Sequence, residues 1–527
     1  MTHLSTRLQA FLACALFILF GTALIPFPGV QEDEALFGIP IYLFNPKELS
    51  IIIFHRHIPL MVMTYVGALK TWIYAAIFHV CRVNVWSVRL PMVLAGTVTV
   101  FFFYRLTERS AGSLAALLAA FFLASDPSFL VTNTFDWGPV ALGHLLLVTG
   151  CYFVLRFVQE SDRMRHLATG FFLFGLGLWN KALMLWVLAG LACAVIAVFR
   201  HEAWKLASRK VFAIGIAAFL VGALPVLLYN LRHPNSTLGS NAHVESAPPV
   251  AILSHKLVVA RAALNGSGLF GFIPAPEWDH RQLPATRQGR VAAWAGDHLV
   301  RRQSSGFDYV FLAALAAIPL WWRARAARFS LVFLIVTWLA MAITRGAGGA
   351  IHHAVLLWPF PQFFVAVVLS AIPWRKAAIA MGVLIVAMNL LVDNEYLLEL
   401  DENGAAGNFT DALFPLSKAL PDGPPVYVVD WGMDNTIAMF HQGRALVRPV
   451  DGLFHATEPT DVQSRIIKIV LTDPEGIFVG HVPERDVMTD VRPNLDRAAD
   501  ALGRHKQMIR IIYDSHGRAV FEIFKFV

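Results

Sequence analysis

Charged residues are scarce in this chain. Asp, Glu, Lys and Arg make up only 15% of its 527 residues, whereas apolar residues make up 57%. Soluble globular proteins have about 45–50% apolar and about 25% charged residues. With a mean hydropathy of +0.57, the composition excludes an ordinary soluble domain. It predicts a mainly α protein that crosses a membrane many times.

Cysteine is scarce as well. The four cysteines lie in or beside apolar segments and form no CxxC pair; they are Cys14, Cys81, Cys151 and Cys193. We therefore expect neither a disulfide framework nor a zinc site. The net charge of +7 does not indicate nucleic-acid binding, because the basic residues cluster in short loops between apolar runs, as membrane topology requires.

Long segments without any charged residue recur along the chain. The first, Leu8–Val30, has an Ala13-Cys14-Ala15 sequence like a signal-peptide cleavage site, but the run continues well beyond it, so we interpret it as a retained first span. Further runs are Leu90–Tyr104, Leu114–Phe135 (interrupted by Asp126), Trp137–Leu155, Leu167–Asn180, Ala182–Phe199, Val211–Leu231, Tyr309–Trp322, Phe329–Thr344, Ala354–Trp374 and Ala377–Val392. Together they predict a bundle of about eleven transmembrane helices.

Alternate loops carry the positive charge. These residues are Arg105, Arg109, Arg156, Arg163, Arg165, Arg200, Lys205, Arg209, Lys210, Arg323, Arg325, Arg328, Arg375 and Lys376. Excess Lys and Arg mark the cytoplasmic side of a membrane protein. We therefore expect a cytoplasmic N-terminus, a first outer loop at about 30–87, a long outer loop at about 230–308, and an extracytoplasmic C-terminus. The bacterial inner membrane is the expected location.

The first outer loop contains an apolar segment, Ile51–His79, that also carries His55, Arg56, His57, Lys70 and His79. This mixture favours helices that lie in the membrane interface. A transmembrane segment over Ile58–Ala76 is the alternative, but it would invert every later loop and destroy the charge bias.

The composition changes after Asp393. Strand-like segments Pro425–Asp430, Gly476–Val482 and Ile509–Tyr513 alternate with helix-like Asp461–Leu471 and Asn494–Leu502, and a hairpin turn is expected at Ser515-His516-Gly517. We therefore divide the chain into a transmembrane domain, 1–393, and a small outer α/β domain, 394–527.

Three consecutive acids, Glu32, Asp33 and Glu34, follow the first span. They could simply form the solvated cap of a membrane helix. The predicted topology, however, places Asp136 and several cations on the same face; the cations are Lys181, Arg232 and Arg345, with His352 and His353 beside Arg345. A carboxylate can take a proton from an attacking hydroxyl while cations stabilise a departing phosphate. This set therefore suits displacement of a phosphate from a lipid-anchored substrate.

Several motifs in order resemble a known family. They are DEALFG after the first span, HIPL at His57–Leu60, VRLPMVLAGTVTVFFFYRL, SDPSFLVTNTFDWGP, GLWNKALMLWVL and LPVLLYNLRHP. The sequence from about Ser5 to Asp393 resembles the GT-C membrane glycosyltransferases, specifically the dolichyl-phosphate-mannose-protein mannosyltransferase-like family 39 and its aminoarabinose-transferase relatives. The terminal domain carries no motif of this kind.

The resemblance implies a GT-C type bundle that transfers a sugar, with inversion, from a polyprenyl phosphate carrier to an acceptor on the extracytoplasmic face. It places the family's first-loop acid on Asp33, with Glu34 beside it, and the second-loop acid on Asp136. The second loop departs from the family's Arg-Pro-Asp-like pattern, and HIPL lacks one proline but retains His57. The phosphate-binding candidates are Lys181, Arg232, Arg345, His352 and His353, and the first-loop substrate candidates are Arg56 and His57.

Other interpretations remain open at this stage. Glu32 is expected to be a solvated neighbour, Asp126 to end a helix before Pro127, and Lys181 either to contact phosphate or to reach the headgroups. Some relatives use a divalent cation at the first-loop acid, but the spacing fixes no metal site. A transporter or lipid flippase is the main alternative function, and a catalytically inactive scaffold is a third. The acceptor could be a lipid, a glycan or a protein.

Overall fold

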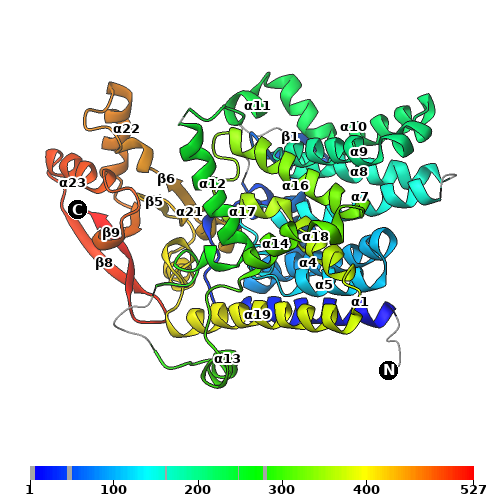
Figure 1. Cartoon of the computed structure of the whole chain (residues 1–527). Coiled ribbons are helices and arrows are strands. Elements are labelled where there is room, and N and C mark those ends of the chain that lie inside the picture. Colours follow the sequence, from blue (N-terminus) through cyan, green and yellow to red (C-terminus); the bar gives the residue numbers. More distant parts are fainter. Residues whose placement is uncertain (1–5, 44–49, 161–162, 247, 277–281) are drawn as a thin grey trace.

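Helices dominate the computed structural model, which describes residues 6–43, 50–160, 163–246, 248–276 and 282–527. Figure 1 shows one helical bundle with the terminal domain packed against one of its ends. The first and last long helices of the bundle, α1 (Thr6–Leu24) and α19 (Arg375–Glu402), run side by side along one flank. The predicted fold class, a transmembrane-type bundle with a small α/β domain, is confirmed.

All of the predicted charge-free runs form helices. Besides α1 and α19, these helices are α4 (Val85–Ala111), α5 (Ser113–Ala124), α6 (Pro127–Phe135), α7 (Val140–Gln159), α8 (Met164–Asn180), α9 (Met184–Leu206), α10 (Arg209–Arg232), α14 (Phe307–Ala316), α15 (Ile318–Trp321), α16 (Arg325–Ile343), α17 (Ile351–Ala354), η3 (Val355–Leu357) and α18 (Phe360–Ser370). Among the described residues, 7 helices are long and apolar enough to cross a membrane, and 9 spans result if each of two bent pairs counts as one. The two remaining helices of the eleven expected, α8 with 17 residues and α14 with 10 residues, are shorter than these spans.

The first of the two bent pairs breaks at a residue that caps a helix. The first, α5 with α6, bends by 56°. Asp126 lies in this break as the N-cap of α6, and its Oδ1 accepts a hydrogen bond from Phe129 N at 2.8 Å. Its Oδ2 accepts a second one from Gln362 Nε2 at 2.7 Å. Asp126 therefore starts the second half of a broken span rather than ending the first, with Pro127 at the first helical position, where it is tolerated.

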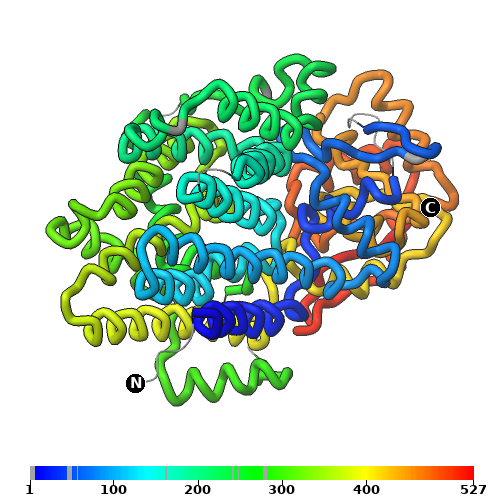
Figure 2. Tube along the Cα trace, turned by 90° about the vertical axis from the view of Figure 1, so that its right-hand side faces the viewer, coloured from blue at the N-terminus to red at the C-terminus, as the bar shows by residue number. Residues whose placement is uncertain are grey.

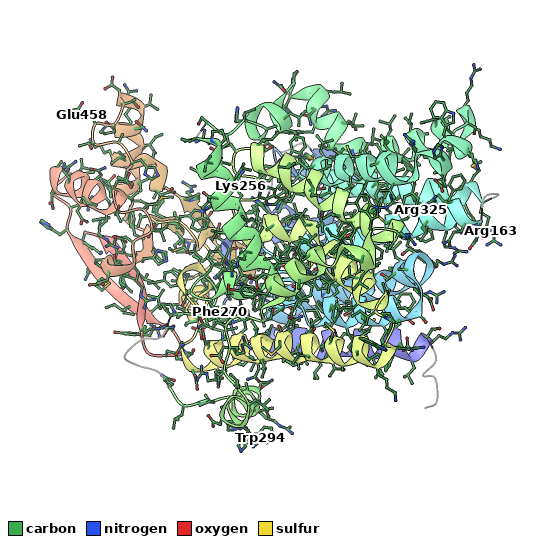
Figure 3. The ribbon with its side chains drawn as sticks, in the orientation of Figure 1. Arg163, Lys256, Phe270, Trp294, Arg325 and Glu458 are labelled. Carbon is green, nitrogen blue, oxygen red and sulfur yellow. The ribbon has the colours of Figure 1, made fainter. Side chains whose placement is uncertain are left out.

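The basic loops and the terminal domain lie at opposite ends of the bundle. In Figure 3, Arg163 and Arg325 are at one end and Glu458 of the terminal domain is at the other. This arrangement is the one that the alternating loop charges predict for a bundle whose spans run along the long axis of Figure 1.

The first outer loop differs from the expectation of interfacial helices, which was wrong for most of its length. Its part from Ser50 to Val80 forms two short hairpins, β1 (Ser50–Ile53) with β2 (Arg56–Pro59) and β3 (Met61–Met63) with β4 (Val66–Gly67), followed by the helix α3 (Leu69–Val80). The β-branched run Ile51–Ile53 favours a strand. Since Ile58–Ala76 begins with the end of β2 and continues through β3 and β4 before it enters α3, it does not form the alternative span either.

The long outer loop contributes α11 (Ser236–Asn241), α12 (Pro249–Leu264), η2 (Ser267–Leu269) and α13 (Arg287–His298). Figure 1 shows α13 nearly end-on beneath α19, and Figure 2 shows it lengthwise, so it lies across the span direction. Asn394 Nδ2 donates a hydrogen bond to Ala292 O at 2.9 Å, which ties α13 to α19. The helix α19 itself continues through the expected domain boundary at 393 as far as Glu402.

The terminal domain is the expected α/β domain. Its five-stranded sheet has the order β6-β5-β7-β9-β8. The strands are β5 (Pro425–Val428), β6 (Leu446–Pro449), β7 (Ile477–His481), β8 (Lys506–Tyr513) and β9 (Ala519–Phe526), and the helices are α20 (Leu413–Ala419), α21 (Asp434–Phe440), α22 (Asp461–Leu471) and α23 (Val491–Ala501). Strand β5 is parallel to both β6 and β7. The predicted strands, both helices and the hairpin turn, with Gly517 at φ +76°, are confirmed.

Candidate functional site

The three acids after the first span form a single helical turn. This turn, α2, spans Glu32–Ala35, and the Gln31 side chain caps it by accepting hydrogen bonds from Asp33 N at 2.7 Å and Glu34 N at 3.2 Å. Adjacent side chains of a helix point in different directions. The three carboxylates therefore face three different parts of the protein.

Glu34 faces the membrane domain. Its carboxylate and the guanidinium of Arg89 on α4 form a two-pronged ion pair, Nε to Oε1 and Nη2 to Oε2, both at 2.8 Å. The Arg89 side chain is fully buried and also donates to the carbonyls of Ile25, Pro28 and Gly29 at 2.7–2.8 Å. Arg89 thus fixes both the end of the first span and the helical turn that carries the acids.

Glu32 faces the terminal domain, and the expectation that it is solvated was wrong. Its side chain is only 3% exposed. Both carboxylate oxygens accept from Asn435 N, at 3.2 and 3.1 Å, at the start of α21. Burial, followed by the charge of Asp434, raises the pKa of Glu32 well above its ordinary range. Burial raises the pKa of Asp434 too.

Asp33 is the acid that faces open space. Its side chain lines a cavity of about 350 Å³ between the membrane domain and the terminal domain. Burial raises the pKa of Asp33, while its hydrogen bond with Gln31 and the nearby charge of Lys181 act in the opposite direction. A partly buried carboxylate with a raised pKa is a better proton acceptor than a free one.

Aromatic rings surround this cavity. The lining includes Trp137, Phe272, Phe409 and Trp431, with the polar side chains Gln31, Asp33, His352 and Asn408. Trp137 packs against Phe272 and Phe409 with ring centroids 5.9 and 5.5 Å apart. An apolar cavity with a few polar groups is the usual form of a small-molecule site.

Asp136 is fully engaged in the structure. It ends α6 in a left-handed conformation, and its Oδ1 accepts from Val140 N at 2.6 Å and Ala141 N at 2.9 Å, at the start of α7. Lys70 of α3 lies 2.9 Å from Asp136 Oδ2, and its Nζ donates to Asp136 O at 2.6 Å. Because Lys70 and Asp136 are both buried, the pair fixes the loop that carries Trp137.

Lys181 and the two histidines lie next to this loop. Lys181 directly follows α8, is 5% exposed and donates a hydrogen bond from Nζ to Gly138 O at 2.9 Å. Burial lowers the pKa of Lys181 to about 8, although Asp136 and Asp33 oppose the shift. Trp137 Nε1 donates to His352 Nδ1 at 3.2 Å, and His353 Nδ1 lies 3.0 Å from Gly346 O. The structure thus brings Asp33, Asp136, Lys181 and both histidines together.

The remaining predicted residues are not part of this group. Arg232 at the end of α10 and Arg345 after α16 have exposed side chains, and neither belongs to the cavity lining. His57 lies in β2 with an exposed side chain, and its Nδ1 is 3.4 Å from Ser50 Oγ. Arg56 lies in the same strand, and its side chain is outside the described part of the structure.

A metal site has no preformed ligand group here. Among the described residues, no group of three or more His, Cys, Asp or Glu side chains could hold a metal ion.

Sequence analysis missed the residues that hold the acids in place and those that shape the cavity. Lys70 and Arg89 each stand alone in an apolar stretch, and a lone cation there needs a buried partner. That signal could have found both. Phe272, Phe409 and Trp431 come from distant parts of the chain, and no local pattern distinguishes them from core aromatic residues.

Known proteins show similarity at two levels. Residues 67–229 match the family described as dolichyl-phosphate-mannose-protein mannosyltransferase. No curated protein sequence matches the chain significantly. The match covers the segment from the end of the first outer loop to the end of α10, including Lys70, Arg89, Asp136 and Lys181.

Solved structures share the fold over almost the whole chain. ArnT from Cupriavidus metallidurans bound to undecaprenyl phosphate superposes with a TM-score of 0.60 at 14% identity, covering 98% of this chain and 97% of that one. The oligosaccharyltransferase AglB from Archaeoglobus fulgidus, in complex with an inhibitory peptide and a dolichol-phosphate, gives 0.52 at 13% identity, covering 98% of this chain and 74% of that one. The predicted resemblance to the GT-C superfamily is confirmed.

Proposed function

We propose that this chain, a membrane glycosyltransferase of the GT-C type, moves a sugar from a polyprenyl phosphate carrier to an acceptor hydroxyl or phosphate on the extracytoplasmic face. The transfer inverts the configuration of the sugar, and Asp33 is the general base. The solved structures of ArnT and AglB, which share the fold, hold undecaprenyl phosphate and a dolichol-phosphate, respectively, which supports a carrier of this chemical class.

One observation carries the assignment of the base. Of the three adjacent acids, Glu34 is paired with Arg89 and Glu32 is bound to α21, whereas Asp33 faces the cavity. Residues of both domains line the cavity, and Figure 1 shows the terminal domain at one end of the bundle. A substrate whose lipid tail stays in the bilayer could therefore present its headgroup there.

The reaction needs a base and cations for the leaving group. Asp33 takes the proton of the acceptor hydroxyl, the oxygen attacks the anomeric carbon, and the bond from that carbon to the phosphate oxygen breaks with its electron pair. A phosphate acceptor, already ionised, would attack directly. The leaving carrier phosphate is a weak base, so no general acid is needed. Lys181, which is buried beside the loop that carries Trp137, stabilises its charge. His352 lies on the cavity wall.

A transporter is the second candidate, because Asp126 and Asp393 are both buried inside the bundle, each 1% exposed. Buried acids in spans often mark ion pathways. Asp126, however, caps α6 and binds Gln362, which is a structural use. The family match and the set of groups around Asp33 favour sugar transfer.

The decisive experiment compares glycoconjugates of cells with and without the protein. We expect one glycoconjugate to lose a single sugar, and the purified protein to restore that sugar from an undecaprenyl phosphate donor. NMR of the product should show an inverted anomeric configuration. An unchanged glycoconjugate profile, together with failure of a lipid or solute to cross the membrane, would instead identify a transporter.

A further inference from the structure

The terminal domain meets the first outer loop on both sides of α2. Before the turn, Gly29 N donates to Phe409 O at 2.7 Å, and a Cβ atom on Gly29 would lie 2.0 Å from Thr410 O. After the turn, a Cβ atom on Gly38 would lie 2.7 Å from Met439 Sδ, and Met439 is fully buried. Asp33 thus lies between two points where the domains are in close contact.

Glu32 is the polar contact between these points. Its carboxylate receives the Asn435 N–H, and Thr436 Oγ1 donates to Val30 O at 2.9 Å. Asn435 and Thr436 belong to the first turn of α21, whose N–H groups lack helical partners and favour a negative charge. Glu32 therefore holds the start of α21 against α2.

The loop that leads into α21 carries Trp431 into the cavity. Strand β5 ends at Val428 between β6 and β7, and ligands of parallel sheets commonly bind at the carboxyl ends of such strands. Asp430 stiffens the loop, because its Oδ1 accepts from Trp431 N at 2.8 Å and its Oδ2 from His481 Nδ1 at 2.7 Å. Trp431 itself lines the cavity opposite the membrane domain.

Asn408 adds a polar side chain to the same wall, and its Oδ1 lies close to Gly432, the residue after Trp431. It lines the cavity, and its Oδ1 is buried without a hydrogen-bond partner in the part of the chain that the structure describes. A buried acceptor without a partner costs free energy, which a ligand hydroxyl would recover. An indole face and an amide acceptor together suit a sugar, which has apolar C–H faces and polar hydroxyls.

We propose that the terminal domain completes the sugar-binding cavity, with Trp431 and Asn408 as binding residues for the transferred sugar and Glu32 as the positioning residue that holds their wall in place. This proposal rests on the proposed sugar transfer. It gives the terminal domain a direct part in the reaction and gives Glu32 a role distinct from that of Asp33.

The first test is transfer kinetics with undecaprenyl phosphate carrying the sugar identified by the glycoconjugate comparison. Trp431→Ala and Asn408→Ala should each lower kcat/KM for this donor about tenfold, mainly through KM. Glu32→Ala should cause a similar loss, whereas Glu32→Gln, which still accepts the Asn435 N–H, should behave like the native protein. Glu458→Ala, at an exposed position of the terminal domain, is the matched control for Glu32→Ala.

The double variant Glu32→Ala/Trp431→Ala tests the coupling between them. If Glu32 acts by placing Trp431, the double variant is no worse than Trp431→Ala alone. Losses that multiply would overturn the positioning role, and normal kcat/KM in both Trp431→Ala and Asn408→Ala would overturn the sugar-binding wall.

Hydrogen–deuterium exchange tests the contact independently of any transfer reaction. Without substrate, Glu32→Ala should speed exchange across residues 430–440, and Glu32→Gln should not. Equal exchange in all variants would overturn the positioning role even if sugar transfer is confirmed. If exchange is faster in Glu32→Ala but the native protein transfers no sugar, the positioning role of Glu32 is supported and the proposed function is rejected.

Discussion

The guanidinium of Arg89 donates two hydrogen bonds of 2.8 Å to the carboxylate of Glu34, and both side chains are almost completely buried. The pair joins α4, inside the bundle, to the turn that presents Asp33. A buried pair of this kind need not stabilise a protein relative to apolar residues, but removing one partner leaves an unpaired charge in a dry environment. Its role here is to fix the position of α2.

Arg89→Ala should therefore destabilise the protein by about 3–5 kcal/mol, because it strands the Glu34 charge. Thermal unfolding in detergent is the measurement. Arg105→Ala is the matched control on the same helix, since its ion pair with Glu108 is partly exposed and should contribute at most about 1 kcal/mol. Equal effects of the two substitutions would show that the Glu34 pair is not a fixing element.

Asp33→Asn should cut turnover by about 10²–10⁴ without unfolding the protein, because the amide keeps the shape of the side chain but cannot accept the acceptor's proton. Turnover of purified, folded protein at saturating donor is the measurement. Glu32→Gln should cost much less. Near-normal turnover in Asp33→Asn would remove Asp33 from the mechanism.

Lys181→Ala should raise the donor KM about tenfold or more, since a charge-assisted hydrogen bond to the carrier phosphate is lost. Arg232→Ala and Arg345→Ala should have smaller effects, because both side chains are exposed, whereas Lys181 is buried beside the loop that carries Trp137. If Arg232 does clamp the phosphate with a two-pronged contact, Arg232→Lys should be a poor replacement. Unchanged donor use in all of these variants would place the phosphate clamp elsewhere.

The affinity for the donor should fall at alkaline pH because Lys181 loses its proton. Burial lowers the pKa of Lys181 to about 8, so the ammonium is present below that pH and is lost as the pH rises through it. Donor affinity should fall accordingly. Lys181→Arg keeps its charge at high pH and should remove this fall in affinity. A fall that stays near pH 8 in Lys181→Arg would belong to another group.

Cysteine labelling of intact cells should report opposite sides for the two ends of the bundle. In a cysteine-free background, Glu458→Cys should react with an impermeant reagent from outside, whereas Arg163→Cys and Arg325→Cys should react only after the membrane is opened. These positions suit the test better than Glu34 or Asp136, which are buried. External labelling of Arg325→Cys would invert the topology and place the cavity on the cytoplasmic side.

Local patterns in the sequence determined much of the fold. Charge-free runs require helices, since a membrane leaves no other partner for backbone N–H and C=O groups, and each run from Leu8–Val30 to Ala377–Val392 lies largely within helices. Alternation and turn residues likewise predicted β5, β7, the start of α22 at Asp461 and the hairpin at Gly517. These features depend on residues that are neighbours in sequence.

Tertiary structure alone decided the different environments of Glu32, Asp33 and Glu34. Three adjacent acids look equivalent in sequence, and their environments come from Asn435, from the cavity and from Arg89, which lie as many as 403 residues away. The expectation from sequence that Glu32 is solvated was wrong for the same reason. Only packing of the terminal domain onto α2 determines which carboxylate is buried, which is paired and which faces the open cavity.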